Sequence, residues 1–219
     1  MRHDAQAVTD GVALDIDENI DVITPYALCS DVVRIPRDVD KVLHRARIPA
    51  AQFGEGLAAW KGTLVSLTWH DGVAHRWTAA LKPTGTRRYE GEGWGLASDA
   101  RGFVRSDGRA TLTFHDPETL KVTRRLGVTF AGRPLDQLNE LEIVDGAILA
   151  NVWHQPFIVR IDPASGRVTG VIDLRAIVAE VGLTDPEAVA NGIAWDAAKR
   201  RLFVTGKRWP MVFEIALPL

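Results

Sequence analysis

The sequence predicts an all-β fold and, within that class, a five-bladed β-propeller. Two observations support this prediction. Short runs of β-branched and aromatic residues alternate with Asp-Gly, Lys-Gly, Ser-Gly and Asp-Pro turns, a pattern typical of β-strands. One segment plan also recurs along the chain at spacings of roughly 39 to 52 residues. Repeats of that length, each with about four short strands, are typical of propeller blades.

The clearest copy of this plan is Leu138–Ile161. It opens with Leu-Asn-Glu-Leu, crosses a turn at Asp145-Gly146 and continues through an apolar strand to Trp153. Asp-Gly between two apolar runs is the strongest short-range signal for a β-hairpin. Three further segments follow the same plan. Phe53–Trp69 has a Lys-Gly turn, Glu92–Asp107 has a looser turn, and Asn191–Lys207 has a charged turn.

The chain therefore divides into five repeats. In chain order they are 8–49, which is the least regular, Phe53–Thr84, Glu92–Gly127, the repeat that opens at Leu138, and Asn191–Leu217. A helix is predicted only within residues 175–188, between the fourth and fifth repeats. We expect residues 1–219 to form a single domain in which the first and last segments pair, because an open ring would expose sheet edges.

Composition narrows the possible partners. The net charge of −2 indicates neither a nucleic acid nor an anionic membrane as a partner. The single cysteine, Cys29, excludes an internal disulfide. The first residues lack the pattern of a signal peptide, and no window resembles a membrane span. The chain as written is expected to be a cytoplasmic monomer; if a leader has been removed, the alternative is a periplasmic or secreted protein.

Equivalent strand openings of a propeller converge at one mouth of its central channel, so they are candidates for a site. The openings carry Glu55, Trp94, Asn139 and Asn191, and the positions after the next strand carry Trp69, Trp153 and Lys207. A carboxylate, carboxamides, an ammonium group and indoles around one cavity suit a small ligand. Each residue also has a simpler interpretation. The tryptophans can pack between blades, the asparagines can satisfy turns, and Glu55 and Lys207 can form an ordinary ion pair.

Metal and nucleophile chemistry finds little support in the sequence. Six histidines are present, at positions 3, 44, 70, 75, 115 and 154, and none has a recognised ligand spacing with Cys or Glu. No serine or cysteine lies in a nucleophile motif. We therefore predict no metal site.

Nine motifs, in order over most of residues 53–217, resemble one enzyme family. They are FGEGL (53–57), LTW (67–69), GEGWGL (91–96), FHDPETLKV (114–122), LNELE (138–142), ANVW (150–153), RIDPASG (160–166), NGIAWD (191–196) and VTGKRWP (204–210). The chain is similar to the plant and bacterial type of glutaminyl-peptide cyclotransferase, a five-bladed propeller unrelated to the zinc-dependent animal enzyme.

This resemblance implies that the chain cyclises the N-terminal glutamine of peptides or proteins to pyroglutamate, with release of ammonia and without a cofactor. It implies that Glu55 is the acid–base carboxylate and that Asn139 and Lys207 are polar substrate contacts. The implied substrate-binding residues are Phe53, Trp69, Trp94, Trp153, Asn191 and Trp209, together with Asp10 of the first repeat.

The first repeat, residues 1–50, departs from the family pattern. The family's Phe-Thr-Gln-Gly-Leu is replaced by Val8-Thr9-Asp10-Gly11-Val12, so a second carboxylate is expected at the mouth. Two alternatives follow from this departure. One is a non-catalytic propeller that binds a peptide or small ligand. The other is a metal-dependent hydrolase of the lactonase kind, with Asp10, Glu55, Asn139 and Asn191 around the metal.

Overall fold

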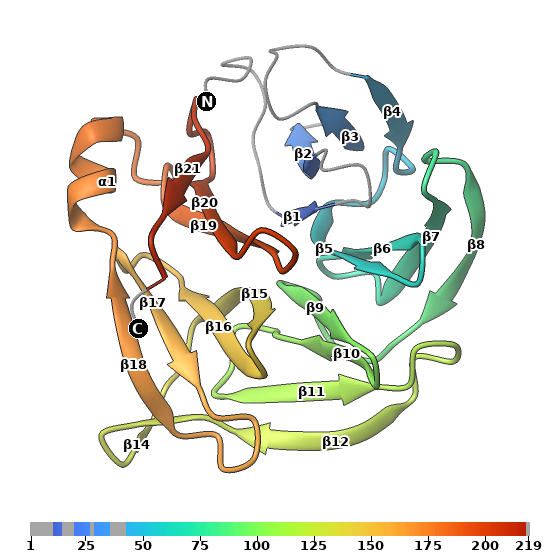
Figure 1. Ribbon diagram of the computed structural model, residues 1–219. Coiled ribbons are helices and arrows are strands. Elements are labelled where there is room, and N and C mark those ends of the chain that lie inside the picture. The colour runs from blue at the N-terminus through green and yellow to red at the C-terminus, as the bar shows by residue number, and fades with distance from the viewer. Residues whose placement is uncertain (1–10, 15–19, 27–28, 36–42, 218–219) are drawn as a thin grey trace.

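The computed structural model describes residues 11–14, 20–26, 29–35 and 43–217, and these form an all-β propeller around a central axis (Figure 1). Four antiparallel sheets of four strands each form complete blades. Blade one is β1 (Gly11–Leu14), β2 (Ile20–Tyr26), β3 (Cys29–Ile35) and β4 (His44–Arg47). Blade two is β5 (Gly54–Trp60), β6 (Thr63–Thr68), β7 (Val73–Thr78) and β8 (Pro83–Arg88). Blade three is β9 (Leu96–Asp99), β10 (Gly102–Arg105), β11 (Thr111–His115) and β12 (Val122–Gly127). Blade four is β15 (Leu138–Val144), β16 (Ala147–Val152), β17 (Phe157–Ile161) and β18 (Val168–Asp173).

The last sheet differs from the expectation of five four-stranded blades. In the described part of the chain it has three strands: β19 (Ala190–Asp196), β20 (Arg201–Gly206) and β21 (Phe213–Ile215). The structure therefore contains four complete blades and not five. The sequence also did not predict the small hairpin β13 (Thr129–Phe130) and β14 (Arg133–Pro134). The helix expected within residues 175–188 is confirmed as α1 (Arg175–Val181). No helix in the described ranges is both long and apolar enough to span a bilayer.

The ring closes where the first and last sheets meet. β1 packs beside β5 on one side and beside β19 on the other, at the centre of the disc (Figure 1). The predicted pairing of the first and last segments involves residues 1–10, which lie outside the described residues.

The expected hairpin of blade four is confirmed. Val144 pairs with Ala147, so Asp145 and Gly146 are the two turn residues, and both have positive φ values, 49° and 76°. This is the conformation of a type I′ turn, whose twist matches that of the two strands that it joins. The turn places the start of β15 and the end of β16 together at one end of the blade.

The hydrophobic core lies between neighbouring blades, because both faces of each sheet are covered. Every residue of β16 is buried. Ile148 and Ala150 pack in a cluster with Val104 of blade three, whereas Leu149, which points to the other face, packs with Ile193 of β19. Side chains alternate between the two faces of a strand, so a strand that is covered on both faces is apolar throughout.

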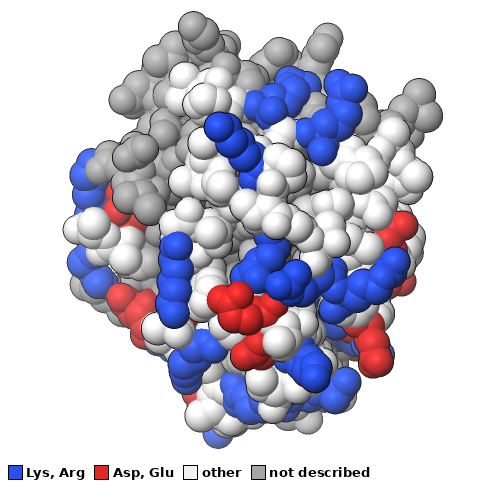
Figure 2. All heavy atoms as spheres, turned by 90° about the vertical axis from the view of Figure 1, so that its right-hand side faces the viewer, with Lys and Arg blue, Asp and Glu red and all other residues white. Residues whose placement is uncertain are grey.

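The outermost strands of the first three blades are strongly basic. β4, β8 and β12 carry exposed arginine pairs: Arg45 and Arg47, Arg87 and Arg88, Arg124 and Arg125. Figure 2 shows the side of the disc that Figure 1 has on the right, where these charges are interspersed with acidic side chains. Charged side chains on exposed edge strands oppose edge-to-edge pairing with another sheet, and this suffices to explain the pattern.

Replacing Gly95 with alanine will destabilise the propeller, because the inner strands approach closely there. A Cβ at Gly95 would lie 2.7 Å from the Cα of Glu140 and 2.9 Å from the carbonyl carbon of Asn139. Both are backbone atoms of the neighbouring blade, so the blades must move apart, at a cost of about 1–3 kcal/mol. Urea denaturation will measure the loss. Gly127→Ala is the control, since a Cβ there would have nothing within 4 Å. Equal stability of the two variants would contradict the prediction.

Glu142 links blade four to the last sheet and makes stability depend on pH. Its Oε1 accepts a hydrogen bond from the backbone N of Ile143 (2.7 Å), and its Oε2 accepts one from the backbone N of Trp195 (3.1 Å). Burial raises the pKa of Glu142 from 4.5 to about 7. Between these two pH values the folded state keeps a proton that the unfolded state has released, so stability falls as the pH rises through about 7.

Glu142→Gln removes this titration. From pH 4.5 to pH 8, its free energy of unfolding will rise relative to that of the wild type by roughly 1–3 kcal/mol; the upper value corresponds to the full pKa shift. Chemical denaturation at several pH values measures the difference. A difference that is the same at every pH would contradict the assignment.

Candidate functional site

A β-bulge at the same place in three inner strands presents the candidate polar residues. In β5, Gly54 pairs with Thr68 and Leu57 with Ser66, so Glu55 and Gly56 together lie opposite a single residue. The same register shift occurs in β15 at Asn139 and Glu140, and in β19 at Asn191 and Gly192. A bulge redirects a side chain, and the first residue of each of these three bulges is one of the predicted site residues.

The residues that follow the second strands of three sheets, β6, β16 and β20, also occupy equivalent positions. The backbone N of Trp69 donates to the carbonyl of Phe53 (2.8 Å), that of Trp153 to Gln137 (2.8 Å) and that of Lys207 to Val189 (2.9 Å). The predicted recurrence of these positions is confirmed. The equivalence brings Trp69, Trp153 and Lys207 to the end of the disc at which the three bulges lie.

Blade three fills the same positions with different residues. Leu96 pairs with Arg105 as Leu57 pairs with Ser66, so Trp94 occupies the position of Glu55, and Gly108 that of Trp69. The ring of Trp94 lies over Gly108, where a Cβ would be 2.7 Å from the indole. The large side chain at the bulge position is therefore accommodated by the absence of one at the position after the strand.

Glu55 and Lys207 meet across the channel. The Nζ of Lys207 lies 3.7 Å from the Oε1 of Glu55, and the two side chains are only 18% and 7% exposed. They come from blade two and the last sheet, which are brought together only when the ring closes. A charged pair withdrawn from water is costly unless the two charges compensate each other. The arrangement places a carboxylate and an ammonium group within reach of one ligand.

Aromatic rings surround the mouth. Phe53 and Trp69 make an edge contact with ring centroids 5.8 Å apart, and Trp69 stacks on His70 at 3.8 Å. Trp94 and Trp153 form a T-shaped pair at 5.6 Å. The other four tryptophans, Trp60, Trp77, Trp195 and Trp209, pack in the hydrophobic clusters between blades. The three tryptophans singled out from the sequence, Trp69, Trp94 and Trp153, are therefore not members of these clusters.

Two polar atoms at the mouth have no hydrogen-bond partner among the described residues. They are the Oδ1 of Asn139 and the indole Nε1 of Trp153, and both are buried. Buried polar atoms are nearly always hydrogen-bonded in folded proteins. One acceptor and one donor are therefore available here to a bound molecule.

Two predicted residues have structural contacts instead. Asn191 is fully buried, and its Oδ1 accepts a hydrogen bond from the backbone N of Glu140 (3.3 Å), which ties β19 to β15. Trp209 was predicted to bind substrate, but the structure places it in the core, 1% exposed. Its Nε1 donates to the carbonyl of Ala188 (3.0 Å), and its ring contacts Phe213. Trp209 follows β20 by three residues, so the turn carries it back between the blades.

One residue at the mouth was missed. Glu92 occupies in blade three the position of Phe53 in blade two, and its Oε2 accepts hydrogen bonds from the Nε1 of Trp69 (2.9 Å) and of Trp94 (2.8 Å). Its Oε1 lies 3.4 Å from the Nδ1 of His70. The signal in the sequence was the alignment of EGWGL with FGEGL. Asp10 and Val8, by contrast, lie outside the described residues.

The described part of the chain holds no group of three or more His, Cys, Asp or Glu side chains placed to bind a metal ion. Two of the six histidines are buried in structural roles. His75 contacts the Oε1 of Gln52 through its Nε2 (2.7 Å), and His115 contacts the carbonyl of Leu120 through its Nδ1 (2.8 Å). Burial lowers the pKa of both imidazoles, which favours their neutral forms.

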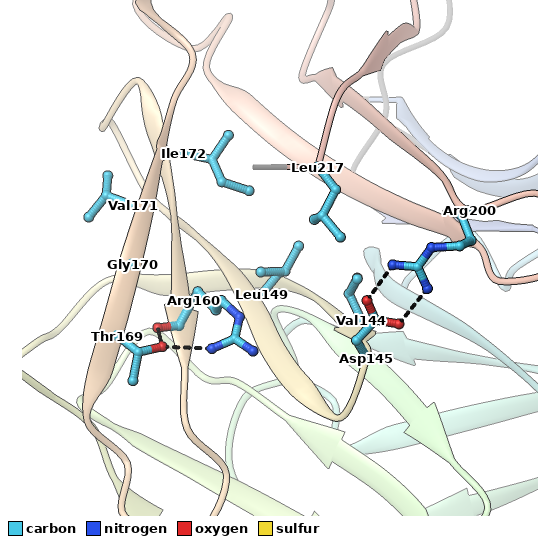
Figure 3. A pocket seen from close by; sticks show the side chains of 10 residues that line it. All are labelled: Val144, Asp145, Leu149, Arg160, Thr169, Gly170, Val171, Ile172, Arg200 and Leu217. Atoms are coloured by element: carbon cyan, nitrogen blue, oxygen red, sulfur yellow. Dashed lines mark hydrogen bonds and ion pairs between the residues drawn. The ribbon is translucent and has the colours of Figure 1, made fainter. Parts of the chain in front are cut away.

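Two cavities lie away from this mouth. One, of about 410 Å³, adjoins the Asp145 turn, at the opposite end of β15 from Asn139 (Figure 3). Its apolar floor includes Leu149 and Leu217, and its two guanidinium groups are engaged: Arg160 donates to Thr169, and Arg200 pairs with Asp145. The second has a similar volume and adjoins the turn between β9 and β10. Neither cavity is lined by a predicted site residue.

Comparisons with known proteins agree on one family. The family model described as glutamine cyclotransferase matches residues 1–217. A curated glutaminyl-peptide cyclotransferase from Arabidopsis thaliana is 34% identical, over 98% of this chain and 68% of the plant protein. The crystal structure of a glutaminyl cyclase from Myxococcus xanthus superposes with a TM-score of 0.92 at 36% identity, over 98% of this chain and 92% of that one. The WD40 propeller domain of Doa1 is similar in fold alone, with a TM-score of 0.59 at 12% identity, over 99% of this chain and 81% of that one.

Proposed function

Because the chain belongs to the glutamine cyclotransferase family, we propose that it converts the N-terminal glutamine of peptides or proteins to pyroglutamate and releases ammonia. The observation that carries this proposal is the paired Glu55 and Lys207 at a mouth surrounded by indoles. The pair offers a proton acceptor and a cationic donor 3.7 Å apart, and the rings offer an apolar wall.

In the proposed reaction, the neutral α-amine of the substrate attacks the carbon of its own side-chain amide. Glu55 takes a proton from the amine as the new C–N bond forms. It returns that proton to the amide nitrogen as the old C–N bond breaks, and the nitrogen leaves as ammonia with the bonding electron pair. One carboxylate thus serves first as general base and then as general acid.

Two further groups assist in this mechanism. The Nζ of Lys207, beside Glu55, donates to the amide oxygen on which negative charge develops. The side-chain amide of Asn139 occupies in blade four the bulge position that Glu55 occupies in blade two. Preorganised donors of this kind lower a barrier by about 3 kcal/mol each. The rings of Phe53, Trp69, Trp94 and Trp153 hold the glutamine side chain curled and exclude water, which would otherwise give glutamate.

This arrangement is best described as the mouth of five blades, with β19–β21 as the fifth. Support comes from the bulge of β19, which matches those of β5 and β15, and from the packing of β19 between β15 and β1. Lys207 then has the same place in its blade as Trp69 has in blade two.

The function is tested with purified protein and a peptide that begins with glutamine. Ammonia release and loss of one ammonia from the peptide mass are the expected results, and the same peptide acetylated at its α-amine will not react. Chelation of metal ions will leave the rate unchanged. Binding of the peptide without any turnover would favour the non-catalytic propeller, and loss of activity on chelation would favour the metal-dependent alternative.

Asp10→Gln will raise the turnover of peptides that begin with glutamine. Asp10 stands where the family has glutamine, so this change removes a negative charge that we expect at the mouth. Removing one such charge is worth about 1 kcal/mol in water-like surroundings, so we expect a rise of roughly fivefold in kcat/KM. Asp10→Asn separates the effect of charge from that of length, and adding Val8→Phe restores the family's aromatic residue. Steady-state kinetics that do not differ from the wild type would contradict the prediction.

A further inference from the structure

Glu92 connects two indoles that come from different blades. Trp69 follows β6 of blade two, and Trp94 precedes β9 of blade three. A single carboxylate oxygen, Oε2 of Glu92, accepts a hydrogen bond from each indole, at 2.9 and 2.8 Å. The relative orientation of the two rings is thereby set by one acceptor.

The loop that carries Glu92 is held in place by contacts to its backbone. Arg105, only 4% exposed, donates to the carbonyl oxygens of Glu90 and Glu92, and its guanidinium lies over the ring of Tyr89. The backbone N of Gly93 donates to the carbonyl of Trp69 (2.9 Å). The loop from Tyr89 to Gly93 is thus fixed on both sides, which fixes the backbone from which the side chain of Glu92 projects.

The second oxygen of the carboxylate is also engaged. The Oε1 of Glu92 lies 3.4 Å from the Nδ1 of His70, and the ring of His70 stacks on Trp69 at 3.8 Å. Trp69 is therefore restrained at its edge by Glu92 and on its face by His70. Such restraints matter here because Trp69 is 36% exposed, and its other ring contact is the edge contact with Phe53.

We propose that Glu92 is a positioning residue for the cyclisation: it orients Trp69 and Trp94 so that they hold the substrate glutamine side chain curled towards its own α-amine. The inference rests on the proposed function. Ring closure requires the reacting atoms to be held near contact, and a misplacement of about 1 Å can lower a rate by ~100-fold. Glu92 acts through the two indoles and exchanges no proton with the substrate.

Two substitutions separate the acceptor from the charge. Glu92→Gln keeps one carbonyl oxygen that can accept both indole N–H groups, so its kcat/KM will remain within about threefold of the wild type. Glu92→Leu keeps a similar size and has no acceptor, and its kcat/KM will fall by roughly 30-fold, mainly through kcat. Glu90→Leu, which removes an exposed carboxylate two residues away on the same loop, is the control and will leave the kinetics unchanged.

A double-mutant cycle shows whether Glu92 acts through an indole. Trp69→Phe removes one of the two N–H donors, so adding Glu92→Leu to it will cost less than the roughly 30-fold seen in the wild type, because only the hydrogen bond to Trp94 is then left to lose. The accessibility of tryptophan to the quencher acrylamide gives a readout that needs no activity. Quenching will increase in Glu92→Leu and will not change in Glu92→Gln or Glu90→Leu.

The outcomes distinguish this inference from the proposed function. A wild-type protein that does not cyclise glutamine would defeat the proposed function, and the quenching series would still test the restraint on the indoles. An active wild type whose Glu92→Leu variant keeps its kcat and its quenching would overturn the positioning role. So would equal losses in Glu92→Leu and Glu92→Gln, or a loss in Glu92→Leu that is undiminished by Trp69→Phe.

Discussion

Glu55→Gln will lower kcat for the cyclisation of glutamine-initiated peptides by ~100-fold or more, because glutamine keeps the shape of glutamate and cannot accept the proton. KM will change little, since the aromatic wall that binds the substrate is unaltered. Rates of ammonia release at saturating peptide measure the effect. Progress curves without an initial burst, with a residual rate of ammonia release proportional to the concentration of the variant, are the expected result.

Glu142→Gln is a suitable control for this experiment. It makes the same chemical change two residues beyond the bulge of blade four, where the side chain binds backbone N–H groups and not the mouth. Its kcat will stay within about twofold of the wild type, because a change away from the reacting atoms leaves the activation barrier of the cyclisation unaltered. A fully active Glu55→Gln variant would refute the mechanism and leave the family assignment standing.

Lys207→Met will lower kcat by roughly 100-fold, which corresponds to the loss of one oxyanion donor, about 3 kcal/mol. Methionine approximates the length of lysine and has neither charge nor donor. Lys207→Arg keeps a donor in altered geometry and will be intermediate. A kcat for Lys207→Met within a few-fold of the wild type would assign the donor role to Asn139 and leave Lys207 only as the partner of Glu55.

Stability measurements will separate the two roles of Lys207. Either single change removes one of the two charges of a mostly buried ion pair whose Nζ and Oε1 lie 3.7 Å apart. We expect each of Glu55→Gln and Lys207→Met to lower the free energy of unfolding, and the double variant to recover part of that loss. Activity will not recover, because the double variant lacks both the proton acceptor and the donor.

Much of the fold was predictable because its signals are local. The Asp145-Gly146 turn, the short β-branched and aromatic strands and the helix at Arg175–Val181 each depend on residues close in sequence. The prediction of five complete blades was wrong. The last sheet has three described strands, and the length of a repeat does not specify how many strands it forms.

The site was predictable in the same measure. The repeat plan placed Glu55 and Asn139 at equivalent strand openings and Lys207 at the position after the next strand, and the bulges and backbone hydrogen bonds show the same equivalences. Trp209 was misassigned because a motif says which residues occur together and not which way the chain turns after β20.

By itself, then, the sequence determined the propeller class and the turns, because runs of β-branched and aromatic residues, turn chemistry and a recurring segment plan can be read along the chain. Only the tertiary structure decided which side chains touch. Glu55 reaches Lys207, and one oxygen of Glu92 serves both Trp69 and Trp94, because separate sheets are brought side by side around the axis. The contacts on which the proposed chemistry depends join different blades, and no local pattern in the chain specifies the distance between two blades.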